Sequence, residues 1–75
     1  MLVKYGYTVE QQKGGKLLVT LVDFPTGVTE ADNEVEAQEF AQEIAEGLVE
    51  AYKEDGLDIP TASPVTNNKY VEITV

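Results

Sequence analysis

Hydrophobic and polar residues alternate along the first part of the chain. In residues 2–9, LVKYGYTV, the larger apolar side chains fall on one face of a strand and the polar positions on the other. Residues 16–22, KLLVTLV, repeat the alternation, although both faces of this segment are largely apolar. The polar sequence QQKGG between them carries the glycines of a turn. The pattern therefore predicts a β-hairpin over residues 2–22.

A helical period replaces the alternation between residues 33 and 55. Apolar residues recur at spacings of three and four, at Val35, Ala37, Phe40, Ala41, Ile44, Ala45, Leu48, Val49 and Tyr52. Asn33 followed by Glu36 is typical of a helix N-cap, and Gly56 is typical of a helix end. We expect Gly47, inside this helix, to mark close packing against a sheet.

The remaining segments complete a small sheet. A short third strand is expected around residues 27–30, and residues 69–75, KYVEITV, alternate as a final strand. The fold class is therefore α+β, in the order β-β-β-α-β, with one amphipathic helix on one face of a small mixed sheet. A right-handed crossover places the final strand beside the first and parallel to it, in the sheet order 3-2-1-4. We expect one domain over residues 1–75 and no separate DNA-binding domain.

Charge narrows the classes of function. Fourteen acidic residues stand against five lysines, which gives a net charge of −9. Direct nucleic-acid binding requires a basic surface, and anionic membranes also attract basic segments, so both are disfavoured. The absence of a membrane span or a visible export signal leads us to expect a cytoplasmic protein. The acidic charge either keeps the protein dispersed or engages a basic partner.

The chain lacks the usual catalytic residues. It has no cysteine and no histidine, so it has neither a thiolate nor an imidazole. The sequence therefore predicts no enzymatic activity, no cofactor and no metal. Two remote alternatives use carboxylates: a hard cation held by Asp23, Glu30, Asp32 and Glu34, or hydrolysis with Asp23 and Asp32 as an acid–base pair. The spacing of these residues matches no calcium loop, and no pattern around them indicates a pocket.

The most distinctive motif follows the second strand. Residues 22–37 read VDFPTGVTEADNEVEA, and residues 54–63 read EDGLDIPTAS. The two segments resemble the signatures of HicB-type antitoxins, approximately Pro-Asp-Leu-Pro-Gly-Cys-x-Thr-x-Gly-Asp-Thr-x-Glu-Glu-Ala and Glu-Asp-Gly-x-x-Ile-Pro-x-Pro-Ser. The matching positions in the first segment are Asp23, Phe24, Pro25, Thr29, Asp32, Glu36 and Ala37. Thr26, Gly27 and Ala31 depart from the signature, and Asn33 replaces a threonine while keeping the chemistry of an N-cap.

The resemblance implies a partial RNase H-like fold without RNase H catalysis. It also implies a partner, a small basic ribonuclease toxin of the HicA type, which such domains bind and mask. Many members of the family continue into a DNA-binding domain. We expect none here, so the resemblance does not carry operator binding over to this chain.

Two surfaces are predicted to make contacts. The partner-binding residues are expected at the corner and just after it: Asp23, Phe24, Pro25, Glu30 and Asp32. The three acidic ones, Asp23, Glu30 and Asp32, would lie together at one end of the sheet. A homo-oligomer interface is expected on the sheet face that the helix leaves uncovered, at Leu18, Val22 and Tyr70. One alternative to an antitoxin is a small acidic inhibitor, such as a phage-type protein, that mimics nucleic acid and blocks another basic protein. The other is a stand-alone oligomerisation domain.

Overall fold

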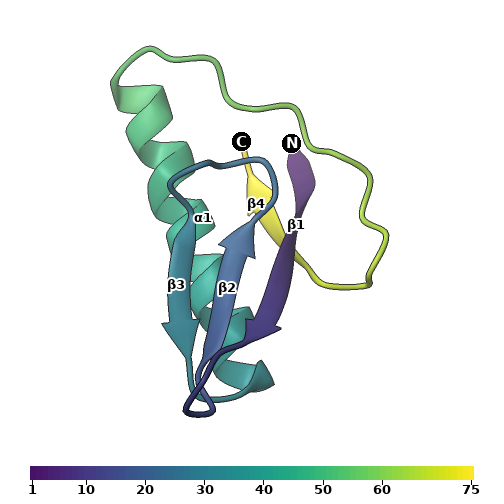
Figure 1. Ribbon diagram of the computed structural model, residues 1–75. Helices are drawn as coiled ribbons and strands as arrows, with labels where there is room; N and C mark the ends of the chain where they lie inside the picture. Colours follow the sequence, from purple (N-terminus) through teal and green to yellow (C-terminus); the bar gives the residue numbers. More distant parts are fainter.

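A four-stranded sheet and one helix form two layers in the computed structural model, which describes residues 1–75 (Figure 1). The strands are β1 (Leu2–Gln11), β2 (Leu17–Leu21), β3 (Val28–Ala31) and β4 (Tyr70–Thr74), and the helix α1 spans Glu34–Glu54. The strand order across the sheet is β3-β2-β1-β4. The predicted element order and sheet order are therefore confirmed.

The direction of the last strand differs from the prediction. β4 pairs with β1 in antiparallel register, from Leu2 opposite Thr74 to Gly6 opposite Tyr70, and the other two strand pairs are antiparallel as well. The prediction of a mixed sheet with a parallel final strand is wrong. The rule for right-handed crossovers applies to parallel strands that a helix connects directly. Here residues 55–69 carry the chain back along the sheet after α1, and this extra passage reverses β4 (Figure 1).

The core lies between the sheet and α1. Its buried members are Tyr5, Tyr7, Val19, Leu21, Phe24, Ala31, Ala37, Ala41, Ala45, Val49, Val71 and Ile73. The helix presents alanine at three successive fourth positions, and these small side chains allow its backbone to approach the sheet. Gly47 is exposed and has no atom within 4 Å of an added Cβ, so its predicted role in close packing is wrong. Val35, at 70% exposure, also lies outside the buried face.

Local signals fix both ends of α1. The Asn33 side chain accepts a hydrogen bond from the Glu36 backbone N–H at 2.9 Å, as the N-cap prediction requires. The Glu36 carboxylate in turn accepts from the backbone N–H of Asp32 at 2.9 Å. At the other end Gly56 adopts a φ of 70°, a left-handed conformation that glycine adopts without strain. The helix α1 does not have the apolar character that a membrane-spanning helix needs.

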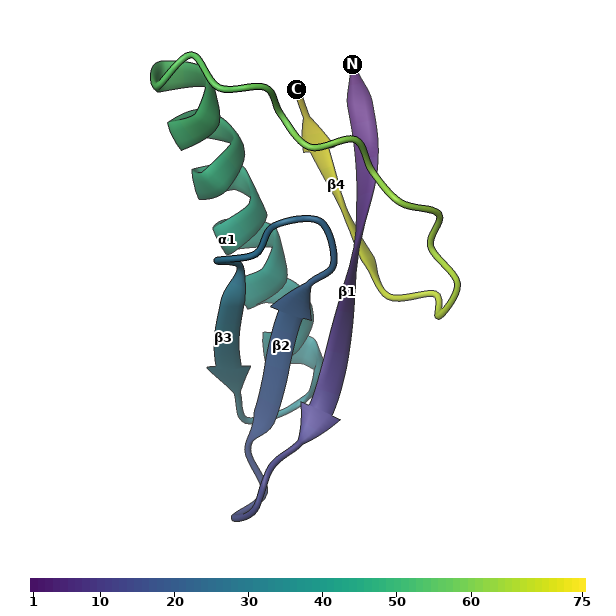
Figure 2. The same ribbon diagram turned by 45° about the horizontal axis from the view of Figure 1, so that its top comes forward.

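Residues 55–69 form a return segment that leaves α1, passes the chain termini and runs beside β1 to the start of β4 (Figures 1 and 2). The Tyr5 hydroxyl donates to the Pro60 carbonyl oxygen at 2.8 Å, and the Asn67 side-chain amide donates to the Tyr7 carbonyl oxygen at 3.0 Å. Ile59 packs against the core between these contacts. Specific contacts therefore hold the return segment to the sheet although it has no regular secondary structure.

Candidate functional site

A tight turn builds the corner between β2 and β3. The Gly27 N–H donates to the Phe24 carbonyl oxygen at 2.9 Å, and the Gly27 carbonyl oxygen accepts from the Leu21 N–H at 2.7 Å. Proline at the second turn position and glycine at the fourth are both favoured in a type I turn. A Cβ on Gly27 would lie 2.6 Å from the Leu21 Cδ1. The sequence of the corner is thus set by backbone geometry and close packing.

Phe24 is a core residue. Its side chain is 0% exposed, and its ring meets those of Tyr5 and Tyr52 edge to face, at centroid distances of 4.9 and 5.7 Å. It therefore links the corner to β1 and to the end of α1. A fully buried ring has no surface to offer a partner, so we assign Phe24 a packing role. Pro25, in contrast, is exposed beside it.

Asp23 joins the two segments that carry the family resemblance. One of its carboxylate oxygens accepts from the Ser63 hydroxyl at 2.6 Å, and the other accepts from the Ser63 N–H at 2.9 Å. Burial raises the pKa of nearby Tyr5, and the Asp23 charge raises it further, so Tyr5 stays protonated as the donor to Pro60. Asp23 thus holds the return segment against the corner.

We expect Asp23→Ala to loosen the return segment and to lower the free energy of unfolding by about 1–2 kcal/mol, because both hydrogen bonds from Ser63 are lost. Urea denaturation measures the loss, and Asp58→Ala, an exposed acid on the same segment, is the control. Ser63→Ala should add little to Asp23→Ala. Fully additive effects of the two substitutions would show that this contact does not hold the segment.

The acidic residues at the far end of β3 form a separate group. The corner precedes β3 and Asp32 follows it, so the strand separates Asp23 from Asp32 by about 13 Å or more. The prediction that Asp23, Glu30 and Asp32 lie together is therefore wrong. The intervening strand runs straight, so it carries the chain away from the corner.

We call Glu30, Asp32, Glu36 and Lys16 the foot of β3. The Lys16 ammonium donates to the Asp32 carboxylate, with both side chains more than half exposed. The hydrogen bond to Asp32 raises the pKa of Lys16, and the charges of Asp32, Glu30 and Glu36 raise it further. Three carboxylates thus surround one lysine, which leaves the foot with a negative net charge in water.

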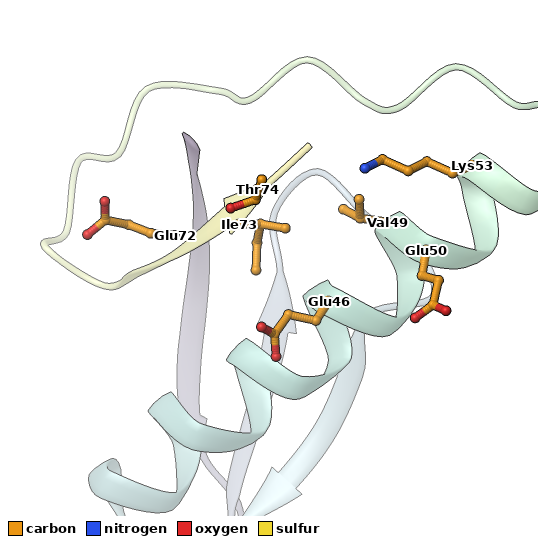
Figure 3. Close-up of a pocket in the computed structure, with 7 residues that line it drawn as sticks. All are labelled: Glu46, Val49, Glu50, Lys53, Glu72, Ile73 and Thr74. Atoms are coloured by element: carbon orange, nitrogen blue, oxygen red, sulfur yellow. The ribbon is translucent and has the colours of Figure 1, made fainter. Parts of the chain in front are cut away.

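The seam between α1 and β4 contains a shallow hollow of about 290 Å³ (Figure 3). Its lining residues are Glu46, Val49, Glu50, Lys53, Glu72, Ile73 and Thr74. Figure 3 shows Ile73 directed toward the helix and Glu72 directed away from it, so the carboxylates do not converge. No group of three or more acidic side chains in the structure could hold a metal ion. The hollow therefore does not bring its carboxylates together at one point.

The three residues of the predicted oligomer interface do not form one apolar patch. Leu18 lies between two glutamates, Glu10 on β1 and Glu30 on β3. A second molecule that buried Leu18 would have to bring these carboxylates close to its own. Self-association through Leu18 stays a prediction, and repulsion between the carboxylates of the two molecules would oppose it.

Val22 and Tyr70 belong to another row of the same face. Both lie beside Gly6. The Val22 N–H donates a hydrogen bond to the Gly6 carbonyl oxygen, and Tyr70 lies opposite Gly6 in the pairing of β4 with β1. The return segment places Val65 over this row, with its Cγ2 3.7 Å from a Cβ built on Gly6. Lys4 also lies over the Tyr70 ring, at 4.7 Å from its centroid. The chain itself therefore covers part of the face that the helix leaves open.

Comparison with known proteins identifies the fold. No family model and no curated protein sequence matches the chain. Among solved structures, the chain is similar to the crystal structure of the N-terminal domain of the Burkholderia pseudomallei antitoxin HicB, with a TM-score of 0.74 and 21% identity. The chain has the fold of the HicB N-terminal domain. The similarity covers 97% of this chain and 98% of the HicB domain, which confirms the fold that the sequence resemblance implies.

Sequence reasoning does not find three residues whose side chains make long-range hydrogen bonds in this chain. Ser63 was part of the second motif, but nothing in its position indicated that it binds Asp23, which is 40 residues away. Gln38 and Gln42 carried no signal beyond their place beside the apolar stripe of the helix. They donate to the backbone of β4, as described below.

Proposed function

We propose that this chain is an antitoxin-like inhibitory domain that binds a small basic ribonuclease toxin of the HicA type and covers the surface with which the toxin binds RNA. One observation carries the proposal: over almost its whole length, the chain shares the fold of the N-terminal domain of an antitoxin. The net charge of −9 supports it independently, because a surface that binds RNA is basic.

The proposed mechanism is steric and electrostatic and requires no catalysis. Exposed carboxylates attract the lysines and arginines of the toxin over long distances and raise the association rate. Once bound, the domain occupies the space that RNA would fill. The protein acts in this way without a cofactor or a metal, in the cytoplasm.

The foot of β3 is the proposed contact for basic side chains of the toxin. Glu30 is exposed there, and Asp32 forms an ion pair with a single lysine, Lys16. Asp23 contributes indirectly by holding the corner in shape. Pro25, exposed at the opposite end of β3, is a separate candidate contact.

A second candidate function rests on the charge alone. An acidic domain of this size also suits an inhibitor that mimics nucleic acid and blocks a different basic protein. Such a mimic would bind several unrelated nucleic-acid-binding proteins with similar affinity, whereas an antitoxin selects its toxin. Binding to a panel of basic proteins therefore separates the two functions.

Reversing the charges at the foot should slow association with a HicA-type toxin. We expect Glu30→Lys with Asp32→Lys to lower the association rate roughly tenfold at low salt, because the attraction becomes local repulsion. The measurement is the association rate to immobilised toxin at several salt concentrations. The difference between variant and wild type should shrink as salt screens exposed charges.

The control is Glu54→Lys with Asp58→Lys, near the far end of the helix. Each double variant gains four charges, so both change the net charge from −9 to −5. We expect the control to affect the rate much less than the foot variant. Equal losses from the two variants would mean that only total charge matters and that the foot is not the contact.

A further inference from the structure

The backbone of β4 forms one open edge of the sheet. Every second residue of β4 forms backbone hydrogen bonds with β1. At one end of the paired strands the Val75 N–H donates to the Met1 carbonyl oxygen, and at the other end the Tyr7 N–H donates to the Lys69 carbonyl oxygen. The backbone groups of Tyr70, Glu72 and Thr74 therefore point away from the sheet. Such an edge is a template for pairing with another chain.

Two glutamines of α1 occupy part of this edge. The Gln38 side-chain amide donates to the Tyr70 carbonyl oxygen at 3.1 Å, and that of Gln42 donates to the Glu72 carbonyl oxygen at 3.0 Å. The spacing of residues along the helix and along the strand explains why α1 can form this hydrogen bond at two successive positions. Four helical residues advance about 6 Å and two strand residues about 6.6 Å, so the donors and acceptors stay in step.

We propose that Gln38 and Gln42 act as a seal that closes the β4 edge to strand pairing with a second copy of this chain. Every copy presents the same edge, and two such edges can pair antiparallel about a two-fold axis at Glu72. That pairing needs the Glu72 carbonyl oxygen as an acceptor, and Gln42 already uses it.

The next helical position marks the end of the seal. Glu46 lies one helical turn after Gln42, and Thr74 lies two strand residues after Glu72, so this pair is the next in the series. Glu46 and Thr74 both line the hollow in Figure 3. An ionised glutamate cannot donate a hydrogen bond, so it cannot continue the series. The seal thus covers the centre of the edge, where a symmetric pair would form.

Disulfide trapping tests the seal directly because the chain has no cysteine. The Glu72 side chain is exposed and points away from α1, so Glu72→Cys provides a single reporter thiol (Figure 3). In an antiparallel pair centred on this residue, the two Cα atoms would lie about 5.5 Å apart, within disulfide range. Gln38→Ala and Gln42→Ala are then added, and the disulfide-linked dimer is measured under mild oxidation.

We expect the two glutamine substitutions to raise the yield of linked dimer about tenfold over Glu72→Cys alone, because each removes a competing hydrogen bond. The control adds Gln11→Ala and Gln12→Ala to Glu72→Cys instead and should leave the yield unchanged. Circular dichroism establishes that each variant is folded. Equal yields with and without Gln38 and Gln42, whether low or high, would overturn the proposal.

Discussion

Phe24→Ala is expected to remove a large part of the protein's free energy of unfolding. Removing a fully buried phenylalanine costs about 3–5 kcal/mol, and a domain of 75 residues is held by only about 4–11 kcal/mol in total. The ring contacts Tyr5 and Tyr52, so its loss affects the sheet and the helix together. Urea denaturation followed by circular dichroism measures the change.

Phe40→Ala is the matched control, since it removes the same side chain from the half-buried edge of the helix. We expect a clearly smaller loss there, because less apolar surface returns to water. If Phe40→Ala proved as damaging as Phe24→Ala, the corner would not be the centre of the core. A Phe24→Ala protein as stable as wild type would contradict the packing described here.

Two glycine-to-alanine substitutions should change stability in opposite directions. At Gly27 the new methyl group would lie 2.6 Å from Leu21 Cδ1 and 2.9 Å from Leu21 Cβ. Leu21 is 2% exposed and has little room to move, so we expect a loss of about 1–3 kcal/mol. At Gly47, in the middle of the exposed helix surface, alanine meets nothing within 4 Å. There we expect a gain of about 0.5–1 kcal/mol from helix propensity.

Thermal melts of the two variants beside wild type provide the measurement. The contrast is informative because the chemical change is identical and only the surroundings differ. A stabilising Gly27→Ala would show that the turn has space the structure does not contain. A destabilising Gly47→Ala would restore the close packing that the sequence suggested for this position.

The elements that depend on local signals were predictable. The capped ends of α1 follow from Asn33 and Gly56, and the strand faces follow from alternation in residues 2–9 and 16–22. The direction of β4 depends instead on the path of residues 55–69, which have no periodic pattern to read. A chain that returns along the sheet before its last strand reverses that strand, and composition does not reveal the return.

The candidate site was predictable only in part. The corner motif was recognised, but its carboxylate was expected at a partner surface, whereas Asp23 binds Ser63 within the chain. Contacts between residues so far apart in sequence depend on the tertiary fold. The separation of Asp23 from Asp32, in contrast, follows from the straight path of β3 once the bounds of that strand are known.

The most direct test of the antitoxin proposal is RNA cleavage by a HicA-type toxin, titrated with this protein. The proposal predicts that at low salt cleavage falls to background at a fixed molar ratio of this protein to toxin, and that a larger excess is needed as salt is raised. The foot variant should inhibit less well than the control variant of equal charge. Undiminished cleavage at a large excess of folded wild-type protein would contradict the proposed function.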